Sequence, residues 1–173
     1  MIALHNILVA TDFGQAAGAA LTYGRALAQT FGARLHVLHA LENSFLRGRS
    51  GDPHAHEAAI LQRLHEQVTA DDRTTLAAHV ALETSDHPAE AITQYAKSAN
   101  IDLIVIGTNG RGALAQLLVG SVAERVVRTA PCPVLTVRHP EHDFVMPDAS
   151  TERSAVGRPK DDAALVAVTQ AER

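Results

Sequence analysis

A glycine-rich stretch that ends in a serine is the part of this sequence best suited to chemistry. Gly107 is followed after two residues by Gly110, and after nine more by Gly120 and Ser121. Glycine has no Cβ, so the backbone at these positions can turn with positive φ or approach a ligand closely. A Gly-Ser pair that begins a helix offers amide N–H groups, a hydroxyl and the positive end of the helix dipole to an anion. The spacing therefore predicts a cradle for phosphate.

Other donors flank these glycines, and one pattern among them has a second interpretation. Thr108 and Arg111 add polar side chains, and a planar guanidinium pairs well with phosphate. The Ser121 hydroxyl and the Val122 amide are placed to donate to the same group. However, Ser121 and Glu124 also fit a capping box, in which the two side chains satisfy amides at the start of a helix. Both roles can hold at once, and neither of the commonest nucleotide-binding fingerprints occurs in the chain.

Asp12 is the second candidate, because it follows directly after an apolar run at residues 7–10. A carboxylate at the end of a strand can hold a ribose hydroxyl, an adenine amino group or a hydrated Mg²⁺ ion. The alternative is that Asp12 caps a helix that begins near Gly14 or Gln15. Since the Gly107 loop also follows a strand, both sites would meet at one sheet edge, and we favour the ligand role for Asp12.

The elements that must position these residues alternate along the chain between strand-length apolar runs and helical patterns. We expect strands at 7–10, 35–40, 77–82, 103–106 and Val134–Val137, and helices over Gln15–Phe31, from near Pro53 (inner face Ile60, Leu61, Leu64 and Val68), from Pro88 (inner face Ile92, Tyr95, Ala96 and Ala99) and over 122–129. This alternation requires crossover connections. The sequence therefore predicts a single α/β domain with a doubly wound, five-stranded parallel sheet and helices on both faces. Ligands bind such sheets at the carboxyl ends of the strands, where Asp12 and Gly107 fall.

The composition limits the classes of function open to the chain. The formal net charge is −4 and no long basic block occurs, so nothing points to a nucleic-acid surface. Aromatic residues make up only 3% and tryptophan is absent. The chain therefore lacks the aromatic side chains on which the bases of single-stranded nucleic acids usually stack. No apolar run has the length of a membrane span, and the N-terminus has no signal-peptide pattern. We expect a cytoplasmic protein that binds neither nucleic acid nor membrane.

The cysteine and the histidines do not suggest a catalytic or metal centre. Cys132 is the only cysteine, so no disulfide can form within the chain, and we expect it to be a small buried residue. The pairs His36/His39 and His54/His56 lack a third ligand at metal-site spacing. We interpret them as solvated histidines, with a hydrogen-bonded structural role for His39 in its strand.

The sequence changes character after residue 138, so the predicted domain covers residues 1–138. Residues 139–160 are polar, contain Pro140, Pro147, Gly157 and Pro159, and show no sustained period. We predict a flexible tail over 139–173, in which residues 161–172 have the pattern of a short helix.

Five motifs in order resemble the ATP-binding branch of the universal stress protein family. They are Ile-Leu-Val-Ala-Thr-Asp at 7–12, Leu-His-Ala at 38–40, Pro-Ala-Glu-Ala-Ile at 88–92, Asp-Leu-Ile-Val-Ile-Gly at 102–107, and the spacing of Gly107, Gly110 and Gly120-Ser121. The resemblance covers residues 4–138. It implies a Rossmann-like parallel sheet and a homodimer formed through the last strand, Val134–Val137.

The resemblance also implies which residues meet the ligand. Adenine is expected against Ala10, Asp12 and Ala40, whereas the ribose and phosphates are expected among Gly107, Gly110, Arg111, Gly120, Ser121 and Val122; Thr11 and Thr108 complete the set, and Asp12 is the candidate for Mg²⁺. Two positions depart from the family pattern: Ala40 stands where valine is frequent, and Gly14 where serine is common.

The function implied is that of a regulator in a stress response, which binds ATP and Mg²⁺ and shifts its choice of an unknown protein partner. A slow Mg²⁺-dependent ATP hydrolase is the first alternative, although the sequence offers no convincing base to activate water. The second alternative is a dimeric scaffold that binds no nucleotide, against which the complete glycine signature argues.

Overall fold

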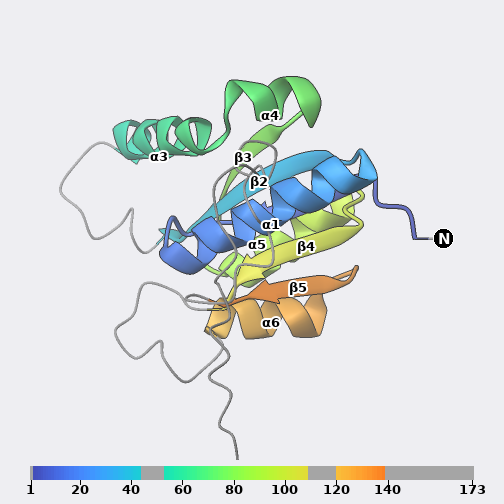
Figure 1. Cartoon of the computed structure of the whole chain (residues 1–173). Coiled ribbons are helices and arrows are strands. Elements are labelled where there is room, and N and C mark those ends of the chain that lie inside the picture. Colours follow the sequence, from blue (N-terminus) through green and yellow to red (C-terminus); the bar gives the residue numbers. More distant parts are fainter. Residues whose placement is uncertain (1, 44–52, 109–119, 139–173) are drawn as a thin grey trace, which may run out of the picture.

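The computed structural model describes residues 2–43, 53–108 and 120–138, and places in them a five-stranded parallel sheet (Figure 1). The strand order is β3-β2-β1-β4-β5. The strands are β1 (Asn6–Ala10), β2 (Arg34–Leu41), β3 (His79–Thr84), β4 (Leu103–Gly107) and β5 (Val134–Val137). The predicted fold class is confirmed. The predicted tail, with its helix at 161–172, lies outside the described residues.

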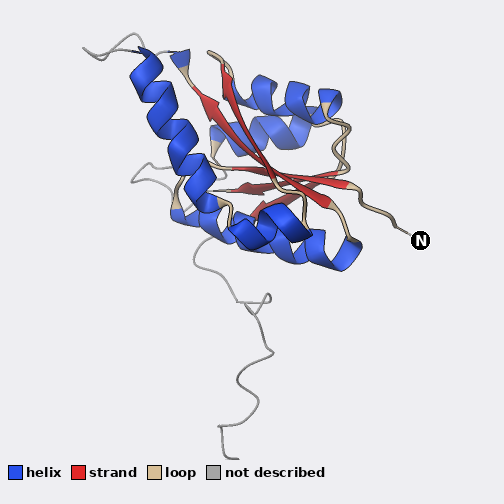
Figure 2. Ribbon diagram, turned by 90° about the horizontal axis from the view of Figure 1, so that it is seen from above, coloured by secondary structure: helices blue, strands red, loops and turns tan. Residues whose placement is uncertain are grey.

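Helices cover both faces of this sheet, as Figure 2 shows from above. They are α1 (Gln15–Phe31), α3 (Pro53–Gln67), α4 (Ala70–Thr75), α5 (Pro88–Ser98) and α6 (Ser121–Thr129). The bounds predicted for α1 are those observed. Within the described ranges, no helix has the length and apolarity needed to cross a membrane.

Successive residues of each strand feed two separate cores. Ile7 and Val9 of β1 pack with α1 and with Leu64 of α3, whereas Leu8 and Ala10 pack with α5 and α6 on the opposite face. This follows from the two-residue period of a strand, which sends alternate side chains to opposite faces. Strand β4 is buried on both faces, which is why its sequence is apolar at every position.

Two predicted features were wrong in detail. The third strand begins at His79 and not at residue 77, because Ala77 has a φ of 44°, which lies outside the β region. Leu61 was expected on the inner face of α3 but is 36% exposed, whereas Leu64 and Val68 are buried as expected.

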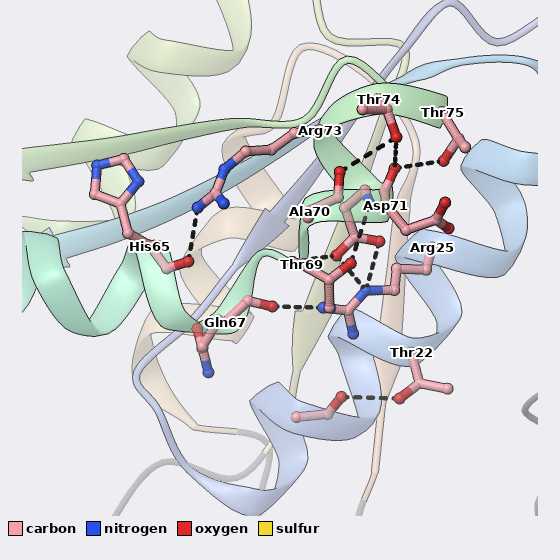
Figure 3. Close-up of polar contacts among 12 residues, drawn as sticks. Thr22, Arg25, His65, Gln67, Thr69, Ala70, Asp71, Arg73, Thr74 and Thr75 are labelled. Carbon is pink, nitrogen blue, oxygen red and sulfur yellow. Dashed lines mark hydrogen bonds and ion pairs between the residues drawn. The ribbon is translucent and has the colours of Figure 1, made fainter.

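The short helix α4 was not predicted, although it fixes α3 against α1. Thr69 and Asp72 form a complete capping box at its start, so the pattern Thr-x-x-Asp in the sequence was the available signal. The Arg25 Nε of α1 donates to both carboxylate oxygens of Asp72, at 3.0 and 2.9 Å, and its Nη2 donates to the Gln67 carbonyl at 2.5 Å (Figure 3). One arginine therefore ties the end of α3 and the start of α4 to α1.

The order in which strands are added to the sheet changes sides at β1. From β1 the chain adds β2 and β3 on one side, then returns to add β4 and β5 on the other. Ala10 and Ile106 stand opposite each other where β1 and β4 end. Such a reversal leaves a crevice at the carboxyl ends of the two central strands, because the connecting chains leave in opposite directions.

Candidate functional site

A cavity of about 580 Å³ opens at the carboxyl edge of the sheet, where β1, β2 and β4 end. Every predicted site residue that the structure describes lines it: Ala10, Thr11, Asp12, Ala40, Gly107, Thr108, Gly120, Ser121 and Val122. Gly110 and Arg111 were also predicted, and they lie outside the described residues. A volume of this size is typical of pockets for small molecules and cofactors.

Asp12 sits in a tight turn between β1 and α1. Its Oδ1 accepts a hydrogen bond from the Gly14 amide at 2.8 Å, while its Oδ2 has no partner within the described part of the chain. The N-cap of α1 is Gly14, without a side-chain cap, so Asp12 holds the turn that precedes the helix and does not cap the helix itself. One carboxylate oxygen thus remains available on the cavity wall.

Gly14 has a direct effect on that carboxylate. A Cβ added at position 14 would lie 2.9 Å from Asp12 Oδ1, closer than carbon and oxygen normally approach. In the sequence, Gly14 is one of the two positions that depart from the family pattern, in which serine is common here. In the structure, its main consequence is room for the Asp12 carboxylate in the observed position.

Phe13 lines the cavity in an unusual backbone conformation. Its φ is 64°, a left-handed value that a bulky aromatic residue seldom adopts. The ring centroid lies 4.8 Å from that of His39, and the Arg63 Cζ lies 4.3 Å over the ring. His39 Nδ1 is 2.7 Å from the Thr11 carbonyl, so the structural role predicted for His39 is confirmed.

Gly107 is needed for a reason that the sequence did not reveal. A Cβ at this position would lie 2.7 Å from the Ala16 carbonyl carbon and 2.9 Å from the Ala17 nitrogen. Its φ is not positive. The missing side chain therefore allows the first turn of α1 to pack against the end of β4, and in doing so brings the turn at Asp12 next to the Gly107 loop.

The capping box that Ser121 and Glu124 fit in the sequence does not form at the start of α6. Gly120 is the N-cap and Ser121 the first helical residue, and the Glu124 carboxylate instead accepts from Arg128 at 2.8 Å. The amides of Ser121 and Val122 have no acceptor within the described ranges. These N–H groups and the Ser121 hydroxyl belong to residues that line the cavity, and they lie at the positive end of the α6 dipole.

Helix α3 forms a second wall of the cavity, and the sequence analysis named none of its residues as site residues. His56, Ala59, Ile60 and Arg63 line the cavity from α3 at helical spacings of three and four residues. Glu42, just after β2, adds a second carboxylate to the cavity wall. The apolar periodicity of α3 identified only the face that packs on the sheet. No group of three or more metal-ligating side chains occurs in the part of the chain that the structure describes.

His36 and His39 lie on the same strand, but His36 is outside the cavity. The interpretation of His36 as a solvated histidine was wrong, because this residue is buried and its Nδ1 lies 3.0 Å from the Tyr95 hydroxyl on α5. Burial, and next the positive charges of His79 and Arg34, lower the pKa of His36 to about 4. This histidine is therefore neutral near pH 7. Cys132, predicted to be buried, is only partly so, and burial is the main cause that raises the pKa of its thiol.

Comparison with known proteins identifies one family. Residues 3–138 match the model of the universal stress protein family. A universal stress protein of Thermus aquaticus is 43% identical over 137 residues, which make up 77% of this chain and 98% of that relative. The universal stress protein UspA from Lactobacillus plantarum has a TM-score of 0.64 and 32% identity, with 80% of this chain and 100% of that chain covered. The universal stress protein from Archaeoglobus fulgidus in complex with dAMP has a TM-score of 0.56 and 26% identity, with 79% and 99% covered.

Proposed function

The chain belongs to the universal stress protein family, and we propose that it binds ATP with Mg²⁺ in the cavity at the carboxyl edge of its sheet. The observation that carries the proposal is the start of α6, where the amides of Ser121 and Val122 and the Ser121 hydroxyl open onto the same cavity as Asp12. Uncommitted donors at a helix N-terminus suit the oxygens of a phosphate. A related structure that holds dAMP supports an adenine nucleotide as the ligand.

The position of the phosphates in this proposal follows from the sheet order. Gly107, Thr108, Gly120 and Ser121 lie where β4 ends and α6 begins. The phosphate chain would run along this side, with Gly110 and Arg111 of the intervening loop as further contacts.

The base would occupy the opposite side of the cavity, near the ends of β1 and β2. Ala10 and Ala40 present small apolar side chains there, together with Leu38 and Leu41. A flat heterocycle buries apolar area against such a surface, and backbone groups at strand ends can read its edge. The short Ala40 side chain leaves more room than a valine would.

Asp12 is the residue we assign to Mg²⁺. This ion is usually held by one or two carboxylates together with phosphate oxygens and water, so a single carboxylate beside the phosphates is a suitable ligand set. Asp12 Oδ2 has no competing partner among the described residues. The ion would neutralise part of the charge on the phosphate chain.

A regulatory role fits these residues better than hydrolysis. Asp12, the carboxylate that we place beside the phosphates, makes no ion pair with a histidine or lysine of the described residues that would make it a base aimed at water. Phosphoryl transfer requires a positioned nucleophile as well as a phosphate cradle. We therefore propose a nucleotide-dependent regulator, whose ATP-bound form selects a protein partner.

We further propose that the regulator is a homodimer. Within the described residues, β5 pairs with β4 on one side only, which leaves its other edge available to a second copy. The Thr108 amide donates to the Val137 carbonyl at 2.7 Å, so the phosphate side of the cavity adjoins the proposed interface. Nucleotide binding could thereby change the pairing of the two chains.

Calorimetric titration with ATP in the presence and absence of Mg²⁺ tests the proposal. We expect one ATP per chain and tighter binding with Mg²⁺. Absence of saturable heat would favour the scaffold alternative. Release of phosphate measured over hours would then separate the two nucleotide-binding functions, because steady turnover would identify a hydrolase and none would leave the regulator.

A further inference from the structure

Arg63 is a cation on the cavity wall that makes no ion pair within the described part of the chain. It lies on the α3 face that lines the cavity, and its guanidinium carbon sits 4.3 Å over the Phe13 ring. No carboxylate lies within ion-pair distance of it in the described ranges. Its interaction with Phe13 therefore fixes the position of the guanidinium, and no acceptor for its N–H groups occurs among the residues that the structure describes.

The elements place Arg63 away from the phosphate side of the cavity. Helix α3 packs on β2 and β3, whereas α6 packs beside β5 and against α5. The sheet order puts β1 and β4 between these two walls. A ligand whose phosphates lie at Ser121 therefore turns its other end toward α3.

We propose that Arg63, supported by Phe13, contacts the base of the bound nucleotide through the plane of its guanidinium. The proposal rests on the function proposed above and adds a residue that determines how the base is held. An arginine plane is weakly hydrated and stacks on aromatic rings, and it can hold a ring on each of its faces. Phe13 occupies one side, and the heterocycle of the ligand extends the stack.

The unusual backbone at Phe13 agrees with this role. A left-handed φ at an aromatic residue is unfavourable and persists only where the surroundings hold it. His39, itself bound to the Thr11 carbonyl, contacts the ring of Phe13, and Arg63 covers it from α3. The resulting layer of His39, Phe13 and Arg63 joins the end of β2 to α3 across the base side of the cavity.

The test compares ATP with adenosine, because adenosine has the base but no phosphates. Calorimetry is carried out on the parent chain, on Arg63→Met and on Arg73→Met, a matched control on α4 that does not line the cavity. We expect Arg63→Met to weaken both ligands by the same factor, about tenfold, because one stacking contact is lost. The control should bind both ligands like the parent.

Two results would overturn the inference. If Arg63→Met weakens ATP alone, the guanidinium contacts a phosphate and not the base. If it weakens neither ligand, Arg63 does not contact the nucleotide at all. A parent chain that binds neither ligand would overturn the proposed function and this inference with it, which is a different outcome from a parent that binds and variants that match it.

A conservative variant distinguishes the role of the planar guanidinium of Arg63 from that of its positive charge. Arg63→Lys keeps the positive charge but replaces the plane by a compact ammonium group. We expect it to bind adenosine more weakly than the parent. Equal binding would show that charge alone suffices and would contradict a stacking contact. Circular dichroism should show the parent fold in both Arg63 variants, because the Arg63 side chain is exposed.

Discussion

The Gly120 amide donates a hydrogen bond to the Thr108 carbonyl at 2.5 Å, so the two ends of the glycine-rich segment meet at the rim of the cavity. Thr108 is the first residue after β4, and Gly120 is the N-cap of α6. This single bond sets the start of α6 beside the end of β4. It explains how donors that are fourteen positions apart in the sequence, at Gly107 and Ser121, line one cavity.

The hydroxyl at the start of α6 should contribute to nucleotide binding. We expect Ser121→Ala to weaken ATP about tenfold, because a hydroxyl hydrogen bond to a charged oxygen is lost. Ser98→Ala is the matched control, since its hydroxyl donates to the Tyr95 carbonyl outside the cavity. Calorimetry with ATP measures both. Unchanged affinity in Ser121→Ala would show that this hydroxyl does not meet the phosphates.

The glycine at the end of β4 should matter for stability before it matters for binding. Gly107→Ala places a Cβ against the backbone of α1, 2.7 Å from the Ala16 carbonyl carbon, and should lower the free energy of unfolding by about 1–3 kcal/mol. Gly18→Ala, within α1, meets nothing within 4 Å and should raise it by about 0.5–1 kcal/mol. Urea unfolding measures both. Equal midpoints for the two variants would contradict the packing described for Gly107.

The ion pair that ties α4 to α1 should be among the stronger polar contributions to stability. Arg25→Met leaves the Asp72 carboxylate buried without its partner, which typically costs about 3–5 kcal/mol. Arg128→Met breaks an exposed pair with Glu124 and should change stability by less than about 0.5 kcal/mol. Both are measured by urea unfolding. Similar small effects in the two variants would mean that Asp72 is solvated in solution.

Stability should fall in mild acid because of His36. Above pH 6.5 this group is neutral in the folded and unfolded chains and contributes no pH dependence. Between pH 6.5 and about 4 the unfolded chain binds a proton that the folded chain excludes, so the free energy of unfolding decreases as the pH falls. The slope from one such group is at most about 1.4 kcal/mol per pH unit.

The variant His36→Asn removes this titration and keeps a polar group near the Tyr95 hydroxyl. We expect its unfolding free energy to decline less steeply than that of the parent from pH 6.5 to 4, with the two chains showing parallel behaviour above pH 7. Urea unfolding at a series of pH values provides the comparison. Equal slopes through the acid range would show that His36 takes up its proton in the folded chain.

Much of the fold could be predicted because buried positions are apolar, and their spacing in the sequence differs between strands and helices. Strand β4 is apolar at every position since both of its faces are covered, and α1 shows a clear helical period that ends at Gly32 in the left-handed conformation. The start of β3 was wrong because Ala77 and Ala78 give no strand signal of their own. The helix α4 carries almost no apolar residues, and only its capping box could have indicated it.

The site was predicted in part, and the reason is geometric. Gly107 ends β4 and Asp12 lies two residues after the end of β1, so their meeting at one edge follows from a parallel sheet. Arg63 lies in the middle of a helix, and its place on the cavity wall depends on how α3 is fixed by Arg25 and Asp72. Contacts of that kind arise from tertiary packing and leave no local pattern.

The central claim is that a nucleotide occupies the cavity between α3 and α6, and an amide-resolved NMR titration with ATP and Mg²⁺ tests it most directly. We predict that the largest shifts on binding occur at Thr11, Gly14, Ala40, Thr108 and Ser121, all of which lie in or beside the cavity. Shifts gathered instead around His36 and Tyr95, or a spectrum unchanged at millimolar ATP, would contradict the account.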